Sequence, residues 1–112
     1  MSIISYEDFE RVNIRSGTIV KVEEFPRAKK PAFKVWVDFG LEIGVLQTSA
    51  QITVHYTPEN LVGRKVIGCI NLRERNIAGF LSQFLLLGLS DTEGAICLLS
   101  VEPKVPNGQK MH

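Results

Sequence analysis

The sequence predicts an all-β fold: a small five-stranded Greek-key barrel with short helices at the N-terminus and between the third and fourth strands. Three observations lead to this prediction. Residues 33–39 alternate between apolar and polar side chains, residues 14–25 are rich in β-branched residues, and Gly, Pro, Asn and Asp separate such stretches. Helix signals are confined to two short segments. A sandwich of two sheets would show the same alternation, so periodicity alone does not close the barrel.

The first part of the chain predicts a short helix and a long strand. Ser5 precedes an acidic segment and can accept a backbone N–H, which predicts one or two helical turns after it. Residues 14–25 then form a strand, in which Gly17 indicates a bend or a bulge. Alternation assigns two faces to this strand, with Thr18, Val20 and Val22 on one and Arg15, Gly17, Ile19 and Lys21 on the other.

The second predicted strand has the clearest pattern in the chain. Its apolar face carries Phe33, Val35, Val37 and Phe39, and its other face carries Lys34, Trp36 and Asp38. Gly40 and Gly44 flank a hairpin turn, after which residues 45–49 return as the third strand.

The remaining elements complete the order expected of the oligonucleotide/oligosaccharide-binding (OB) class of barrels. Thr57 followed by Pro58 is a helix start, and Gly63 ends that helix. Strands are then predicted at residues 64–72, 80–88 and 95–101, with a connector at 73–79, a turn at 91–94 and an extended tail from residue 103.

Length and composition indicate one domain, residues 1–112, with 45% hydrophobic and 22% charged residues, the balance of an ordinary globular protein. The longest uncharged apolar run, residues 77–89, is interrupted by Gly, Ser and Gln and is too short to span a bilayer. No signal peptide is visible, so we expect a cytoplasmic protein with no membrane partner. A formal net charge of +1 excludes a protein that coats duplex DNA by bulk charge.

Positive charge gathers in two segments of the chain. Residues 27–34 carry four cations and no acid, and residues 64–75 carry four cations and one acid. If these segments meet in the fold, they form one positive face. The alternative is that they are loop cations that serve only solubility.

No motif in the chain indicates catalysis or a cofactor. Phosphate-binding Gly loops, zinc-like clusters of Cys and His, and nucleophile elbows are all missing from the sequence. Neither His55 nor His112 has a spacing that would pair it with a cysteine as a base. Cys69 and Cys97 both lie among apolar residues and are predicted to be small buried hydrophobes. We therefore expect a protein that is not an enzyme and that holds no cofactor and no metal.

The polar face of the second strand is the candidate binding surface. Open barrel faces bind extended single strands with cations along the backbone and an aromatic ring beneath a base. Lys34 and Trp36 have this character, and Gln47 and Ser49 on the next strand are candidate polar readers. A position for Trp36 at the end of the barrel, or in a dimer contact, would explain it equally well.

Several motifs resemble the tRNA-binding domain family, whose members have an OB fold. Residues 13–19 (Asn-Ile-Arg-Ser-Gly-Thr-Ile) resemble the opening motif of that family, and residues 75–82 resemble a later motif in which a basic residue precedes Gly and then Ser. Similarity to its secretion-chaperone-like CsaA branch extends over residues 25–32, 37–40, 47–53, 77–80 and 105–108. The block at residues 47–53 is the most specific.

The resemblance implies a homodimer, tRNA binding, and a chaperone role toward unfolded or exported polypeptides. Two departures from the family pattern favour an apolar, peptide-binding surface. Leu81 stands where relatives often carry Lys, and residues 82–85 replace the Ser-x-Gly-Met of synthetase-linked members. Both changes remove features associated with RNA contact.

Three functions are therefore open. A tRNA-binding module would contact RNA through Arg15, Lys29, Lys30, Lys34, Trp36, Gln47, Ser49, Arg73, Arg75 and Ser82. A chaperone would bind unfolded or pre-secretory polypeptides through Trp36, Phe80 and Phe84. The third function is an assembly module that only dimerises and recruits.

Dimerisation has a physical reason apart from the resemblance. The chain has more apolar residues than a barrel of this size needs, namely Phe9, Val12, Leu85, Leu87 and Leu89. The N-terminal turn and residues 101–111 are expected to cover them, on a second copy or on the same chain.

Overall fold

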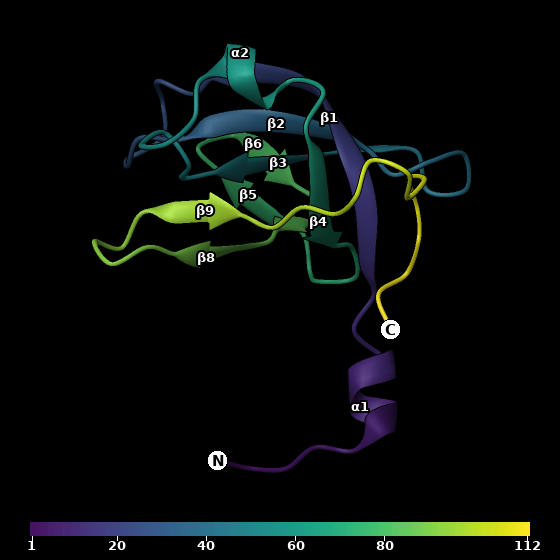
Figure 1. Ribbon diagram of the computed structural model, residues 1–112. Coiled ribbons are helices and arrows are strands. Elements are labelled where there is room, and N and C mark those ends of the chain that lie inside the picture. The colour runs from purple at the N-terminus through teal and green to yellow at the C-terminus, as the bar shows by residue number, and fades with distance from the viewer.

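The computed structural model describes residues 1–112 as a five-stranded antiparallel sheet that curls into a nearly closed barrel, with two short hairpins beside it (Figure 1). The strands of the sheet are, in spatial order, β3 (Val45–Ala50), β2 (Phe33–Asp38), β1 (Ile14–Glu24), β4 (Lys65–Cys69) and β7 (Leu85–Leu86). The hairpins are β5 (Arg75–Ile77) with β6 (Phe80–Ser82), and β8 (Gly88–Ser90) with β9 (Ile96–Leu98). The all-β barrel that the sequence predicts is confirmed.

Both predicted helices are present, and both begin where the capping residues place them. They are α1 (Tyr6–Glu10) and α2 (Pro58–Leu61), capped by Ser5 and Thr57. In each case the cap side chain accepts the N–H of the residue three positions later, and that residue's side chain accepts the cap's own N–H. The short α2 lies at one end of the barrel, where Leu61 is fully buried (Figure 1).

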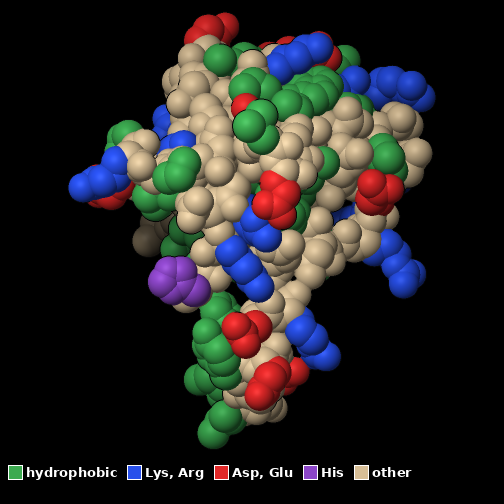
Figure 2. Space-filling view, turned by 90° about the vertical axis from the view of Figure 1, so that its right-hand side faces the viewer, with side chains coloured by type: hydrophobic (Ala, Val, Ile, Leu, Met, Phe, Trp, Pro, Cys, Tyr) green, Lys and Arg blue, Asp and Glu red, His purple; other side chains and the backbone are tan.

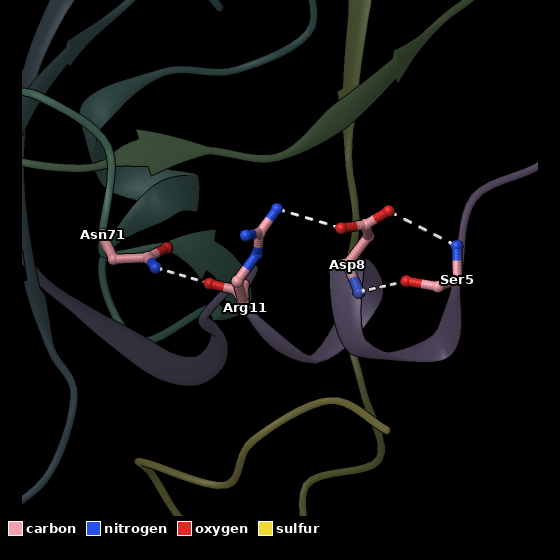
Figure 3. Close-up of polar contacts among 4 residues, drawn as sticks. All are labelled: Ser5, Asp8, Arg11 and Asn71. Atoms are coloured by element: carbon pink, nitrogen blue, oxygen red, sulfur yellow. Dashed lines mark hydrogen bonds and ion pairs between the residues drawn. The ribbon is translucent and has the colours of Figure 1, made fainter.

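The helix α1 lies on an N-terminal arm that projects away from the barrel (Figure 1). Polar contacts hold it there: Asn71 Nδ2 donates to the Arg11 carbonyl at 2.7 Å (Figure 3), and Lys110 Nζ donates to the Glu10 carbonyl at 2.8 Å. Within the arm, the Arg11 guanidinium pairs with Asp8 at 2.9 Å. Asn71 Oδ1 also accepts the Asn13 N–H at 2.9 Å. No residue of α1 is buried, so the direction of the arm depends on these bonds and not on core packing.

The core fills the inside of the barrel. The alternation predicted for β2 is confirmed, because Phe33, Val35, Val37 and Phe39 are all buried while Lys34, Trp36 and Asp38 lie outside. Phe39 meets Phe84 edge-on, with ring centroids 5.0 Å apart. Ile19, Ile52, Leu61, Val66 and Leu86 complete the same cluster.

Strict alternation is wrong for the second half of β1. A bulge between Ile19 and Lys21 shifts the register against β2, so Ile19 and Val22 both pack on the core while Val20 and Lys21 are exposed. The glycine in this strand has a different role from the one expected. A Cβ on Gly17 would lie 2.5 Å from Val37 Cγ1, so close packing of β1 on β2 requires glycine there.

The predicted single strand over residues 80–88 is also wrong, because that stretch contains β6, β7 and the start of β8, which belong to three different sheets. The expected connector contains β5, which pairs with β6 through a two-residue loop of Ala78 (φ 49°) and Gly79 (φ 84°). Both residues adopt the positive φ values of a tight hairpin turn. Alanine is not a usual residue at such a position, so residues 78–79 carry no local hairpin signal.

One of the two cysteine predictions is wrong. Cys69 on β4 is buried as expected, whereas Cys97 on β9 is exposed. Its neighbours in the short β9 strand, Ile96 and Leu98, face the core instead. The apolar run around Cys97 therefore belongs to a strand with one face on the core and the other in solvent.

Three side-chain contacts close the barrel between β3 and the segment at residues 81–84, which we call the closing segment. Gln47 N donates to Gln83 Oε1 (3.0 Å), Ser49 N donates to Ser82 Oγ (3.0 Å), and Thr48 Oγ1 donates to the Phe84 carbonyl (2.7 Å). Gln83 N also donates to the Gln47 carbonyl at 2.8 Å. The closing segment is thus joined to the edge of the sheet by side chains more than by a regular strand ladder.

The C-terminal tail covers the same chain. Backbone bonds join it to the first half of β1: Gly108 N donates to the Ser16 carbonyl and Met111 N to the Ile14 carbonyl, each at 2.8 Å. Arg15 Nη1 donates to the Gly108 carbonyl at 2.8 Å. The tail therefore packs on β1 of its own chain. None of the helices is long and apolar enough to cross a membrane.

The substitution Thr48→Val tests the closing contacts. Thr48 is 3% exposed, and valine keeps its shape but leaves the Phe84 carbonyl without its donor. We expect a loss of about 1–3 kcal/mol in the free energy of unfolding, measured by urea denaturation. Thr92→Val, in the exposed turn between β8 and β9, is the matched control and should change little. Equal effects of the two substitutions would contradict a role for this bond in closure.

Candidate functional site

A groove of about 840 Å³ runs between the loop after β1 and the β5–β6 turn, and we call it the basic groove. Four exposed cations line it, namely Arg27, Lys29, Lys30 and Arg75, and no acidic residue does. None of the four belongs to an ion pair, since the pairs in the protein involve other residues. The groove therefore carries positive charge that no neighbouring carboxylate neutralises.

The floor of the basic groove is apolar. Ala32, Ile52 and Leu86 line it as buried residues, and Leu85 lines it with half of its side chain exposed (50%). Ile96 from β9 contributes to the same lining. A ligand in the groove would meet cations along its edges and hydrocarbon beneath.

Three aromatic rings form a cluster next to the groove. The Phe80 ring lies edge-on to both Trp36 and Phe25, with centroids 5.7 Å apart in each pair. The Lys34 ammonium lies 5.0 Å from the Phe25 centroid and 5.1 Å from the Phe80 centroid. We call Phe25, Trp36 and Phe80 the aromatic cluster. Its position on the outer face of β2 follows from the alternation of that strand.

Trp36 is half-buried, and its neighbours occupy part of its ring. The Lys21 ammonium lies 4.6 Å from the indole centroid, and Nε1 donates to Gln47 Oε1 at 3.2 Å. Lys21 also pairs with Glu23 at 3.1 Å. A base that stacks on this ring must displace the exposed Lys21 side chain, which costs little because the pair is solvated.

The β5–β6 turn joins the groove to the aromatic cluster. Asn76, Ile77 and Ala78 line the groove, and Phe80 two residues later belongs to the cluster. Arg27 reaches across this turn, since its Nη1 would lie 3.8 Å from a Cβ on Gly79. The two features thus form one continuous surface.

The two basic segments of the sequence meet only in part. Lys29 and Lys30 share the groove with Arg75, while Arg73 is exposed nearby in sequence. Arg64 and Lys65 lie elsewhere: the Arg64 guanidinium is over the Tyr56 ring at 5.0 Å, and Lys65 Nζ donates to Asn107 Oδ1 at 2.8 Å.

The face beside the C-terminal tail carries both signs of charge, unlike the basic groove. Figure 2 shows lysine and arginine side chains next to acidic ones on this face, and hydrophobic side chains gathered on the projecting N-terminal arm. Arg15 is fixed close to the tail, because its Nε donates to Asn13 Oδ1 at 2.7 Å and its Nη1 to the Gly108 carbonyl. Two of its donors are therefore used within the protein.

The expected polar readers are used in barrel closure. Gln47 Nε2 donates to the Leu81 carbonyl at 2.9 Å, and its Oε1 accepts from Trp36. Ser49 Oγ lies 3.3 Å from Ser82 Oγ, and Ser82 is only 8% exposed. These polar groups already have partners inside the protein.

Phe84 requires a correction. It was expected to contact a peptide, but it is 5% exposed and belongs to the core, against Phe39. Two residues of the candidate site, Lys21 and Arg27, are not among the contact residues predicted from the sequence. Lys21 reaches Trp36 because of the bulge in β1, which alternation does not reveal. Arg27 is part of the basic run at residues 27–34, and that run was the signal that could have identified it.

Known proteins resemble this chain in sequence and in fold. A family model described as "Putative tRNA binding domain" matches residues 14–110. The methionine–tRNA ligase of Methanocaldococcus jannaschii is 38% identical over 108 residues, which is 96% of this chain and 16% of the ligase. The chain therefore spans only a small part of the ligases it matches.

Crystal structures of two chaperones match nearly the whole chain. The chaperone CsaA of Bacillus anthracis is 39% identical, with a TM-score of 0.91 over 99% of this chain and 100% of its own. CsaA of Picrophilus torridus is 37% identical, with a TM-score of 0.90 over 98% of this chain and 100% of its own. The matched residues 14–110 include all of the strands, the basic groove and the aromatic cluster. The chain belongs to the tRNA-binding domain family.

Proposed function

We propose that this chain binds tRNA, without catalysis, through the basic groove and the adjoining aromatic cluster. The observation that carries the proposal is the set of four groove cations, Arg27, Lys29, Lys30 and Arg75, which no acid accompanies. An RNA backbone supplies the negative charge that this surface lacks, and membership of the tRNA-binding domain family supports tRNA as the ligand. A tRNA partner also implies a cytoplasmic location.

The groove cations act in this proposal as phosphate contacts. All four are exposed, so their charges are hydrated and free to exchange water for phosphate oxygens. Arg27 and Arg75 have the planar guanidinium that binds phosphate with two donors, while the lysines act as point charges. Arg73, two residues before Arg75, is an exposed cation and is a further candidate contact. Phosphate contacts of this kind release counterions, which makes the affinity depend on salt.

The aromatic cluster supplies base stacking. An unpaired base would lie on the Trp36 ring and displace Lys21, which then becomes a further phosphate partner. Lys34, beside Phe25 and Phe80, lies between the cluster and the backbone track. Stacking tolerates different bases, so this surface recognises that a part of the tRNA is single-stranded and does not depend on its base sequence. We leave Gln47, Ser49 and Ser82 out of the proposed interface because their side chains are bonded within the protein. Arg15 is left out because it lies beside the C-terminal tail, outside the groove.

A second candidate function is a chaperone that binds unfolded or exported polypeptides. The apolar floor of the groove favours it, since Leu85 is 50% exposed and Ile52, Leu86 and Ile96 continue the lining. Phe80, on the neighbouring turn, adds an aromatic side chain to this surface. The names of the CsaA structures also support this candidate. Both ligands would occupy one surface and would therefore compete.

We also infer that the protein forms a homodimer through the N-terminal arm. The arm exposes Ile3 (98%), Ile4 (65%) and Tyr6 (65%), and none of α1 is buried in its own chain. The C-terminal tail already pairs with its own β1, so the arm remains as the apolar segment without a partner. A second copy, whose barrel exposes Leu89 (68%) outside the groove, would cover it.

Salt dependence tests the groove as the tRNA interface. With four phosphate contacts, log affinity should fall with log salt at a slope of roughly −3, because each contact to a single strand contributes about −0.7. The substitution Arg75→Gln should weaken binding and make the slope less steep by about 0.7. Filter binding or fluorescence anisotropy at several salt concentrations measures both effects.

Lys104→Gln is the matched control for this experiment, because Lys104 is an exposed cation on the tail, outside the groove. It should leave the slope unchanged. A wild-type slope near zero, or a loss seen with Lys104→Gln instead, would exclude the groove. Binding of an apolar peptide that ignores both salt and Arg75→Gln, with a negative heat-capacity change, would favour the chaperone function.

Trp36 is the only tryptophan in the chain, so its fluorescence reports directly on the aromatic cluster. We expect quenching when tRNA binds. Trp36→Leu should weaken tRNA binding about 5- to 150-fold, corresponding to about 1–3 kcal/mol of lost stacking. Trp36→Phe keeps a π face and should retain most of the affinity, provided that circular dichroism shows all three proteins folded. Full affinity in the leucine variant would rule out stacking at this position.

Sedimentation equilibrium tests the dimer. The wild type should sediment at twice the 12.5 kDa mass of one chain. The double substitution Ile3→Asp and Ile4→Asp should produce the monomer, because it puts charge into the proposed contact. Leu41→Asp, at an exposed turn outside the arm, should leave the mass unchanged. A wild-type monomer at micromolar concentration would end the proposal.

A further inference from the structure

Three side chains with different ligand atoms meet outside the basic groove. His55 comes from the loop after β3, Asp91 opens the turn between β8 and β9, and Cys97 lies on β9. His55 Nε2 lies 2.7 Å from Asp91 Oδ2, and one ligand atom from each of the three residues lies within 4.8 Å of the others. The sequence spacing of His55 and Cys97 did not indicate this meeting, because the fold brings the two segments together.

We propose that His55, Asp91 and Cys97 form a binding site for a transition-metal ion of the Zn²⁺ class. Imidazole nitrogen, carboxylate oxygen and thiolate sulfur are the three donor types that bind Zn²⁺ in proteins. The thiolate selects against Mg²⁺ and Ca²⁺, which prefer oxygen ligands. With three protein ligands, a water molecule completes a tetrahedral shell.

The distances suit a tetrahedral ion after small movements. Zn²⁺ bonds of about 2.0–2.3 Å to nitrogen, oxygen and sulfur separate the ligand atoms by about 3.4–3.6 Å. The His55–Asp91 pair, now 2.7 Å apart, would open as the ion replaces the shared proton. The ligand atoms that are farthest apart, at up to 4.8 Å, would move about 1 Å closer to each other. His55 and Cys97 are both exposed, so rotation of their side chains allows this adjustment.

Asp91 is already held in the orientation of a ligand. Its Oδ1 accepts the N–H groups of Glu93 and Ala95, each at 2.9 Å, which leaves Oδ2 directed at His55. The hydrogen bond from His55, followed by those two amide bonds, lowers the pKa of Asp91 below its ordinary value. Fixed outer contacts of this kind orient metal ligands and raise affinity.

The arrangement is less suited to a cysteine nucleophile. An activated thiol requires a hydrogen bond to its base, and Cys97 makes none to His55. A bound ion would join the loop after β3 to β9. The same two segments supply Ile52 and Ile96 to the basic groove, so the ion would also steady that lining.

Metal titration of the full-length, reduced and metal-free protein tests the site. Addition of Co²⁺ should produce thiolate-to-cobalt charge-transfer absorption, and Zn²⁺ should abolish it as it displaces one equivalent of Co²⁺. Calorimetry with Zn²⁺ should give one ion per chain. Cys97→Ser should remove the absorption and weaken Zn²⁺ binding at least tenfold. Asp91→Asn keeps the turn acceptor but loses the charge, and it should weaken binding by a similar factor.

Cys69→Ala and His112→Gln are the matched controls, because they remove the other cysteine and the other histidine. Both should retain the absorption and the affinity. Saturating Zn²⁺ should raise the melting temperature of the wild type and of His112→Gln, but not of Cys97→Ser. Zn²⁺ binding that is unchanged in Cys97→Ser, or no cobalt–thiolate absorption in the wild type, would overturn the proposal.

Discussion

The contacts between β3 and the closing segment are the constraint on which the rest of the structure depends. Thr48, buried at the edge of the sheet, donates to the Phe84 carbonyl, and the backbone of Gln47 exchanges bonds with Gln83. These bonds turn an open sheet into a barrel and bury the Phe84 ring against Phe39. They also bring the β5–β6 hairpin beside the loop after β1. Without closure there would be no groove between these two segments.

Closure uses polar groups on β3 for contacts within the fold. A sheet edge carries unpaired N–H and C=O groups, which must be satisfied if the edge is covered. Gln47 and Ser49 satisfy them with side chains of the closing segment, where a regular ladder is missing. The cations on the loops and the hairpin take no part in these bonds and remain exposed, which is why the proposed interface is built on them.

The groove joins two kinds of surface, and each matches one of the two proposed ligands. Its cations match a phosphate backbone, whereas its floor of Ile52, Leu85 and Leu86 matches apolar side chains. Electrostatic contacts weaken with salt and apolar contacts do not, so the two functions differ in a measurable physical quantity. The proposed metal site lies on the segments that carry Ile52 and Ile96, which gives the groove a support independent of either ligand.

The sequence by itself determined the elements whose signals are local. The alternation of β2, the caps Ser5 and Thr57, and the turn between Gly40 and Gly44 all depend on neighbouring residues, and all were predicted correctly. The motif at residues 13–19 also indicated the family. Only the tertiary structure decided the bulge at Lys21, the Ala78–Gly79 hairpin and the burial of Phe84. It alone decided which cations share the groove and that His55 meets Cys97. These features arise from contacts between residues distant in the chain, and local periodicity carries no information about such contacts.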